Sequence, residues 1–357
     1  MRGFLIFLSV WVFGQPETVP LDLDGWTVQA QECHLVKYLG QEAIRLQGGY
    51  ALAPTAAFRD GTIEFDIAFA PARSFSGIGF RVVDAFNYEH FYLRPHQTGQ
   101  VDANQYTPSF HGVAGWQLYH GPEYGGAIDY DFDAWMHVKI VTEGRRAAFY
   151  INDMEHPLFV NEALKREVVA GGIAFTASAL APAYFANLTL TRTTAVPAAP
   201  NAATVPEGFV GHWSVSSVMP QSSLGAFEWK DVPNLTWQTL RSEPSGIVNL
   251  AQIGRPTREA DTILAKVVLQ ADGKTHKMMQ FGYSDHVRVY LNGQQLYEGD
   301  NGYQSRDYRY LGTVGLFDAL PLNLKKGENE LIFAVTERFG GWGVMCRFED
   351  LAGLTFK

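Results

Sequence analysis

Seven segments between residues 62 and 191 show the two-residue alternation of apolar and polar side chains that is typical of β-strands. Turn residues separate them, and only NEALKREVV, residues 161–169, has the pattern of a short helix. Successive strands without intervening helices predict antiparallel sheets, and this many strands predict a sandwich. The segments are TIEFDIAF, GIGFRVVD, YEHFYLRP, WMHVKIVT, RAAFYIND, GGIAFTA and YFANLTLT.

The second half of the chain repeats this pattern. Asn292–Gly293 follows a strand-like run and is a strong hairpin signal, and Gly327 marks another turn. Between the halves, residues 193–208 are rich in Pro, Ala and Thr and have the composition of a linker. We therefore predict an all-β fold of two antiparallel β-sandwich (jelly-roll) domains. The predicted ranges are 1–15 for a signal peptide, 16–195 for the first domain, 196–205 for the linker and 206–357 for the second domain.

The N-terminus and the charge limit where the protein acts and what it binds. Arg2 precedes the apolar run FLIFLSVWVFG, which has the length of a signal peptide and is too short to span a bilayer. We expect a secreted or periplasmic protein without membrane insertion. A formal net charge of −9 disfavours nucleic acid as a partner.

Cys33 and Cys346 are far apart in the sequence, and we expect two separate buried thiols. The sequence sets no oligomeric state.

Four motifs of the first half occur in an order that resembles a family. They are GTIEFDIAF, GIGFRVVDAFNYEHFYLRP, DAWMHVKIVTEGRRAAFYIND and GGIAFTA. Together they resemble a concanavalin A-like (laminin-G or glucanase-type) jelly roll over most of residues 20–192. That superfamily includes lectins, glycosidases and adhesion modules, and a group similar in pattern comprises bacterial secreted domains assigned to keto-sugar or glycoside hydrolysis. The resemblance implies the fold and a carbohydrate-related function.

The second half carries GIVNLAQIG, GYSDHVRVYLNGQQLYEG, LPLNLKKGENELIFAV and GGWGVMCRF. These motifs resemble a galactose-binding-like jelly roll over about residues 209–357. Domains of this kind are appended to many secreted carbohydrate enzymes. The resemblance therefore implies an accessory role beside the first domain.

Glu64 and Asp66 lie on one face of the strand GTIEFDIAF. In family-16 glycoside hydrolases, which this strand resembles, a Glu at the position of Glu64 is the nucleophile and a later Glu is the acid/base. The later position is Ala68 or Phe69 here, and neither side chain donates a proton. We expect Glu64 and Asp66 to form the solvated face of a strand, and only if the protein is an enzyme to be catalytic.

The strand YEHFYLRP predicts a ligand-binding face. If Phe91 and Leu93 point to the core, then Tyr88, His90, Tyr92 and Arg94 point to the open side of the sheet, and Arg81 from the preceding strand joins them. Aromatic faces and planar polar groups are what sugars bind. The alternative is an ordinary polar, aromatic outer face.

The long loop of residues 102–126 is rich in glycine and aromatic residues. Loops of this length in compact domains are often functional. We predict Trp116 and Tyr119 as stacking platforms and Gln105 as a partner for hydroxyl groups. The alternative is a lid packed by its own aromatic side chains.

Asp129, Asp131 and Asp133 fall on one side of an extended segment. Oxygen ligands suit calcium, so the three are weak candidates for a structural calcium site, although the spacing lacks the glycine and glutamate of an EF-hand loop. We expect no cofactor apart from this one possibility, and we expect a solvated turn as the more ordinary explanation.

These observations predict an exported protein that binds a polysaccharide or glycan, either non-catalytic or accessory to polysaccharide degradation. One alternative is a glycoside or keto-sugar hydrolase whose lectin-like domain is catalytic. Another is an adhesion module that binds protein. An acid pair on one concave face favours the enzyme, aromatic side chains without such a pair favour the binder, and a flat apolar patch favours the protein-binding module.

Overall fold

The computed structural model describes residues 14–193, 204–224 and 235–357. Within these ranges the regular elements are β-strands and short 3₁₀ helices, with no α-helix, which confirms the predicted all-β fold. No helix among them is long and apolar enough to span a membrane. Most of the predicted signal peptide and most of the predicted linker lie outside the described residues.

The chain divides into two compact units, which we call unit 1 and unit 2. Unit 1 is Met1–Pro108 with Gly121–Pro200, and unit 2 is Ser109–His120 with Asn201–Lys357. The predicted first domain, 16–195, had included residues 109–120. The chain therefore passes between the units three times, after residues 108, 120 and 200.

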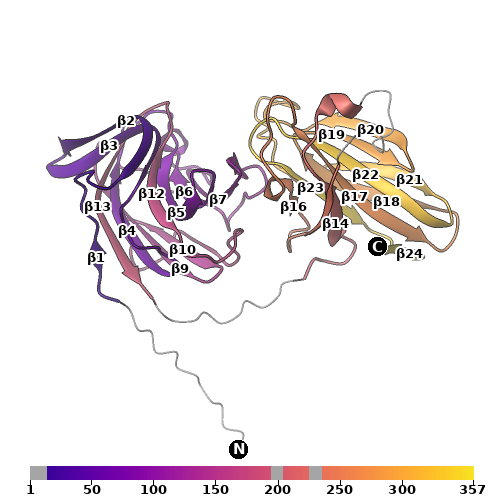
Figure 1. Cartoon of the computed structure of the whole chain (residues 1–357), viewed down its shortest axis with the longest axis horizontal. Helices are drawn as coiled ribbons and strands as arrows, with labels where there is room; N and C mark the ends of the chain where they lie inside the picture. The colour runs from indigo at the N-terminus through magenta and orange to yellow at the C-terminus, as the bar shows by residue number, and fades with distance from the viewer. Residues whose placement is uncertain (1–13, 194–203, 225–234) are drawn as a thin grey trace, which may run out of the picture. The chain divides into compact units, whose positions relative to one another are not determined.

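Unit 1 is built from one long antiparallel sheet that folds into two layers (Figure 1). One layer has the strand order β11-β10-β9-β4-β13-β3 and the other has the order β3-β12-β5-β6-β7, while β2 pairs with β3 and β1 with β13. The last two residues of β7 pair with β8 (Val113–Ala114), and this short hairpin belongs to unit 2. The strands are β1 (Glu17–Thr18), β2 (Thr27–Tyr38), β3 (Gln41–Leu52), β4 (Gly61–Ala68), β5 (Ser76–Asp84), β6 (Asn87–Leu93), β7 (Asn104–Phe110), β9 (Met136–Glu143), β10 (Arg146–Ile151), β11 (Phe159–Asn161), β12 (Gly172–Ala177) and β13 (Ala183–Arg192), with the 3₁₀ helix η1 (Pro95–Gln97).

Strand β3 belongs to both layers of unit 1. Its residues 44–46 pair with β13 and its residues 49–52 pair with β12, while β2 runs along its whole length. Gly48 lies between the two pairings with φ 67°, a conformation that glycine adopts without strain. A Cβ on Gly49 would collide with the carbonyl oxygen of Gln29 on β2. The two glycines let the strand turn from one layer into the other.

The core of unit 1 lies between these layers. Phe175 of β12 stacks on Phe185 of β13 with ring centroids 4.4 Å apart, and Phe65 of β4 lies 5.6 Å from Phe175. All three side chains are fully buried. Contacts across the sandwich therefore hold together the two layers that β3 connects.

Residues 161–169 are not helical, so the predicted short helix is wrong. Three consecutive backbone N–H groups in the middle of this segment donate to residues far away in the sequence. Leu164 donates to the carbonyl of Arg145, Lys165 to the hydroxyl of Tyr106, and Arg166 to the carboxylate of Glu89. Tertiary hydrogen bonds have overridden the local helical pattern.

Unit 2 contains two antiparallel sheets around its own core (Figure 1). One has the order β15-β14-β17-β22-β19-β20 with β24 beside β17, and the other has the order β16-β23-β18-β21. Its elements are β8 (Val113–Ala114), β14 (His212–Ser216), η2 (Gln221–Leu224), β15 (Trp237–Arg241), β16 (Val248–Asn249), η4 (Leu250–Gln252), β17 (Thr262–Ala271), β18 (Thr275–Ser284), β19 (His286–Leu291), β20 (Gln294–Asp300), β21 (Asp318–Leu324), β22 (Gly327–Thr336), β23 (Gly343–Phe348) and β24 (Leu354–Phe356).

The turns predicted in unit 2 are confirmed. Asn292 and Gly293 connect β19 to β20 with φ values of 51° and 85°, as a type I′ hairpin turn requires, and Gly327 begins β22 with φ 91°.

Both cysteines are free. Cys346 is fully buried in the core of unit 2, whereas Cys33 on β2 is only half-buried.

The bend in β3 generates a first prediction. Gly49→Ala should lower the free energy of unfolding by more than about 2 kcal/mol, because the added Cβ has no room beside β2. Gly40→Ala is a matched control at the end of the same hairpin, because Gly40 also has a positive φ of 82° but no atom within 4 Å of an added Cβ. It should cost about 1–2 kcal/mol. Urea denaturation of both variants measures the difference, and equal losses would contradict the steric explanation.

Candidate functional site

The outer face of β6 has the orientation that the sequence predicted. Phe91 and Leu93 are fully buried in the core, and Tyr88 and His90 point to the other side and are partly exposed. Gly79 of β5 lies opposite His90 in the register between the two strands. The face around Tyr88 is therefore open to ligand.

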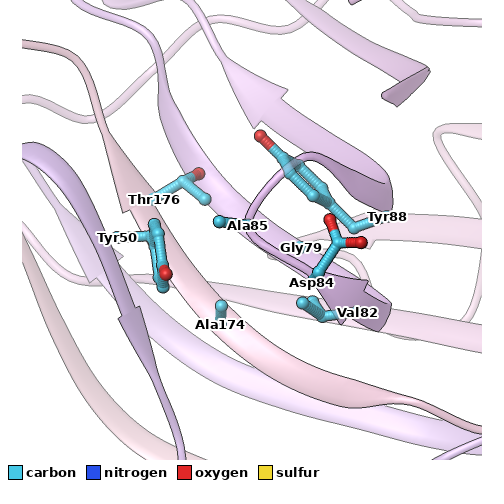
Figure 2. Close-up of a pocket in the computed structure, with 8 residues that line it drawn as sticks. All are labelled: Tyr50, Gly79, Val82, Asp84, Ala85, Tyr88, Ala174 and Thr176. Carbon is cyan, nitrogen blue, oxygen red and sulfur yellow. The ribbon is translucent and has the colours of Figure 1, made fainter. Parts of the chain in front are cut away.

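A shallow, open depression lies on this face. Figure 2 shows Tyr50 of β3 and Tyr88 of β6 on opposite sides, with Ala85 and Ala174 between them. Thr176 of β12 adds a hydroxyl group. The complete lining is Tyr50, Gly79, Val82, Asp84, Ala85, Tyr88, Ala174 and Thr176.

The depression exists because small residues occupy its floor. A Cβ on Gly79 would lie 3.1 Å from the ring of Tyr88, and Ala174 is paired with Gly79 across β12 and β5. Two aromatic rings on either side of a floor of small side chains thus form a shallow surface hollow. Sequence reasoning missed Tyr50 and Thr176, although alternation along GGYAL and GGIAFTA gave the signal that both side chains point outward.

His90 borders the depression as a neutral imidazole. Its Nε2 is 2.8 Å from the Thr176 hydroxyl, and its ring lies 5.5 Å from that of Tyr88 and 4.9 Å from that of Tyr92. Burial lowers the pKa of His90 to about 3. An imidazole that stays neutral above this pH acts through hydrogen bonds and is unsuited to general acid/base work near neutral pH.

Tyr92, Arg94 and Gln105, which were predicted to bind ligand, form a buried network instead. Tyr92 donates from its hydroxyl to Gln105 Oε1 at 2.9 Å, and Arg94 donates to the Tyr92 hydroxyl at 2.8 Å and also to Gln105. Their exposed fractions are 6%, 8% and 5%. Alternation predicted their direction, but not that their polar groups are already satisfied by one another. They support the strand that carries Tyr88 and His90.

Arg81 was also predicted to join the ligand face, and it is buried at 1% exposure. Its backbone has φ 49° at a bulge in β5, which interrupts the alternation. Its Nη2 donates to Asp60 Oδ1 at 2.9 Å and to the carbonyl of Gly144 at 2.7 Å. Gly144 N also donates to Asp60, so Arg81 belongs to a buried ion pair and not to the ligand face.

The carboxylates near β6 do not form an acid pair. Glu89 is fully buried and accepts hydrogen bonds from Tyr106 and from the backbone of Arg166, and burial raises its pKa. Asp84 lines the depression, but it accepts from the backbone N–H of Phe86 at 2.7 Å and thus caps the turn after β5. One carboxylate lines the depression, and it already has a structural role.

Glu64 and Asp66 lie on the outer face of β4, as the sequence predicted, and they share a histidine. His137 on the neighbouring strand β9 places Nδ1 2.7 Å from Asp66 and Nε2 3.5 Å from Glu64. All three side chains are partly exposed, and none lines the depression. Sequence reasoning missed His137, although WMHVKIVT places it on the polar face of its strand.

The His137 cluster perturbs both partners. The hydrogen bond to Asp66 raises the pKa of His137 despite its partial burial. Burial pushes the pKa of Asp66 upward, but hydrogen bonds from His137 and Asn187 hold it below its ordinary value. The cluster is thus an ion pair on a strand surface.

Trp116 and Tyr119, the two predicted stacking platforms, belong to unit 2. Tyr119 is 1% exposed and donates from its hydroxyl to Glu243 at 2.5 Å, so it has no face open to ligand. Trp116 is partly exposed and packs edge-on against Tyr303 and Phe339. Neither residue contributes to the depression on β6.

Asp129, Asp131 and Asp133 are exposed on the extended segment before β9. Tyr130, between the first two, is buried, and Asp133 lies in a turn with φ 50°, so the extended alternation does not continue to the third carboxylate. Among the described residues no group of three or more His, Cys, Asp or Glu side chains is placed to hold a metal ion. Calcium at these residues has no geometric support.

Comparisons with known proteins add little. No family model and no curated protein matches the sequence. Among solved structures, the chain is similar to carbohydrate binding module CBM66 from Bacillus subtilis at 20% identity, covering 46% of this chain and 93% of that one, with a TM-score of 0.35. It is also similar to a Bacillus subtilis protein of unknown function with a galectin-like fold, at 15% identity, 53% and 100% coverage and a TM-score of 0.39.

A GH43 protein from Bacillus licheniformis is similar at 12% identity, covering 42% of this chain and 33% of that one, with a TM-score of 0.30. Identities and TM-scores this low place none of the three close to this chain. The all-β sandwich fold therefore stands on the strand pairing described above.

The buried ion pair generates a second prediction. Arg81→Met should lower the free energy of unfolding by about 3–5 kcal/mol, because it leaves the buried carboxylate of Asp60 uncompensated. Arg59→Met is the matched control, because Arg59 contacts the same carboxylate but is 44% exposed. It should cost about 0–1 kcal/mol. Thermal or urea denaturation measures the stability of both variants. A small loss of stability in Arg81→Met would contradict the buried ion pair and favour the earlier prediction that Arg81 faces the ligand.

The His137 cluster generates a third prediction, on pH. The raised pKa of His137 means that its contribution to stability is full below its unfolded value near 6.5 and is lost as the pH rises through the folded pKa. The lowered pKa of Asp66 means that its contribution is present above about pH 4 and lost in acid. The pair should stabilise unit 1 most between about pH 4 and 6.5.

Replacing the carboxylate tests this window. Asp66→Asn should lower the pKa of His137, measured by NMR titration of its ring, and should flatten the loss of stability above pH 6.5. Asp131→Asn, which removes an exposed carboxylate elsewhere, should leave the His137 titration unchanged. An unaltered His137 titration in Asp66→Asn would show that the hydrogen bond does not govern it.

Proposed function

We propose that unit 1 binds carbohydrate at the depression between Tyr50 and Tyr88, as a non-catalytic module or as an accessory to polysaccharide degradation. The observation that carries the proposal is the pair of tyrosine rings on opposite sides of a floor of Gly79, Ala85 and Ala174. The C–H faces of a sugar ring pack on aromatic rings, and its hydroxyl groups form hydrogen bonds with polar side chains. The Thr176 hydroxyl and the imidazole of His90 supply these beside the rings.

The composition of the depression supports binding over hydrolysis. Glycoside hydrolysis ordinarily uses two carboxyl groups that flank the scissile bond. Asp84 is the single carboxylate of the lining, and it caps a turn. The low pKa of His90 removes the other titratable group from acid/base work near neutral pH. The apolar N-terminal run supports a secreted or periplasmic location for such a module.

A glycan array with the full-length mature protein tests the substrate class, and titration with the best ligand then tests the site. Tyr88→Ala and Tyr50→Ala should each remove about 1–2 kcal/mol of binding free energy, which is roughly a 5- to 30-fold loss of affinity. Both rings are partly exposed, so the melting temperature should change little. Val83→Ala, an exposed position on β5 outside the lining, is the matched control and should bind normally.

Two further readouts separate the alternatives. Because the proposed contacts are rings and hydroxyl groups, EDTA should leave binding unchanged. Release of reducing sugar from a polysaccharide panel should stay at background. If both tyrosine variants bind the ligand with unchanged affinity, the proposed site is wrong. If the protein releases reducing sugar and Glu64→Gln does not, the protein is an enzyme and the binding-module proposal is wrong.

A further inference from the structure

Residues 109–120 are buried in unit 2 to a degree unusual for a loop. Gln117 is fully buried, and Val113, Leu118 and Tyr119 are 9%, 3% and 1% exposed. Val113 belongs to the hydrophobic core of unit 2, together with side chains from β17, β22 and β23. This segment therefore contributes buried side chains to unit 2, although the chain on both sides of it belongs to unit 1.

Gln117 is fixed through all of its polar groups. Its side-chain amide donates to the carbonyl of Leu311 at 3.0 Å, and its side-chain oxygen accepts from the Ser284 hydroxyl at 2.7 Å. Its backbone N–H donates to Gly340, and its carbonyl accepts from Val314. Each of these four partners lies in the C-terminal piece of unit 2, and a buried amide without them would cost free energy.

Two more polar contacts extend this attachment along the segment. The hydroxyl of Tyr119 donates to Glu243 and accepts from Asn249 Nδ2 at 3.2 Å. At the other end, His111 Nδ1 lies 2.8 Å from the carbonyl of Ala251. The segment is thus bonded to unit 2 at its start, its middle and its end.

Four glycines of unit 2 make space for this segment, and we call them the glycine socket: Gly312, Gly340, Gly341 and Gly343. A Cβ on Gly340 would lie 2.7 Å from the side chain of Gln117, and one on Gly343 would lie 2.7 Å from Leu118. A Cβ on Gly341 would lie 2.5 Å from Leu118, and one on Gly312 would collide with Gln117. The glycine-rich sequence GGWG at 340–343 is therefore shaped to residues 117 and 118.

We infer that the glycine socket is a docking surface whose occupant is the segment 109–120 of this same chain, and that this segment fastens the two units without the linker. The occupant is fixed by shape at Leu118 and by hydrogen bonds at Gln117. Unit 2 is incomplete without it, because removing it exposes the core around Val113 and leaves the Ser284 hydroxyl and the Leu311 carbonyl without these partners.

Cleavage of the linker in the folded, full-length protein tests this inference. A recognition sequence for a site-specific protease replaces residues 196–201, and the protein is cut after folding. The two fragments should co-elute on size exclusion in native buffer and separate in 6 M guanidinium. Separation in native buffer into two folded fragments would overturn the inference.

Variants at Leu118 show whether the socket is responsible. Leu118→Asp places a charge in the socket, so the cut fragments should separate, whereas Glu123→Ala, an exposed position just beyond the segment, should leave them together. Co-elution that persists unchanged in a folded Leu118→Asp protein would assign the association to other contacts and overturn the inference.

A size exchange covers the case in which Leu118→Asp does not fold. Gly343 has an ordinary backbone conformation, so Gly343→Ala should lower the melting temperature mainly by its clash with Leu118. In a Leu118→Ala background the same change should cost clearly less, because the clashing methyl groups are gone. Additive losses in the double variant would show that Leu118 does not occupy the socket.

Discussion

The backbone pairing of β3 is the constraint on which unit 1 depends. One edge of this strand pairs with β13 and then with β12, and the other edge pairs with β2 throughout. A shift of one residue in a strand reverses the direction of all its side chains. Because β3 belongs to both layers, such a shift would turn Ile44 and Leu46 out of the core in one layer and move Tyr50 from the open face in the other. One register thus sets the packing of the core and the position of a proposed ligand contact.

The proposed ligand face continues along β6 into a buried network of polar side chains outside the depression. Arg94 stacks over the ring of Tyr92 at 5.0 Å and bonds to its hydroxyl, while Gln105 of β7 accepts from both. Buried polar groups that satisfy one another make a rigid support. Tyr88 and His90 therefore project from a strand whose next side chains on the same face are already fixed by hydrogen bonds, which favours a preformed site over one that forms on binding.

The sequence predicted the all-β fold, the turns at Gly293 and Gly327, and the direction of the side chains on β4 and β6, because these follow from local alternation and turn chemistry. How deeply a side chain is buried does not follow from alternation. Tyr92 and Arg94 point as expected, yet their partners come from β7, which no local pattern pairs with β6. Arg81 departs from the alternation because of a bulge, and Tyr119 belongs to the other unit. His137 was missed because it meets Asp66 only through pairing between strands far apart in sequence.

Because residues 109–120 belong to unit 2, they are synthesised long before most of the unit into which they pack. Leu118 leaves the ribosome more than two hundred residues before Gly343, so at about 5–20 residues per second it waits roughly 10–45 s for the strand that covers it. During that time Val113, Leu118 and Tyr119 have no core to enter, while the remaining strands of unit 1, β9 to β13, are made. The last strands to be made thus complete unit 2 and form contacts that span more than two hundred residues, and contacts between residues so far apart in sequence form slowly.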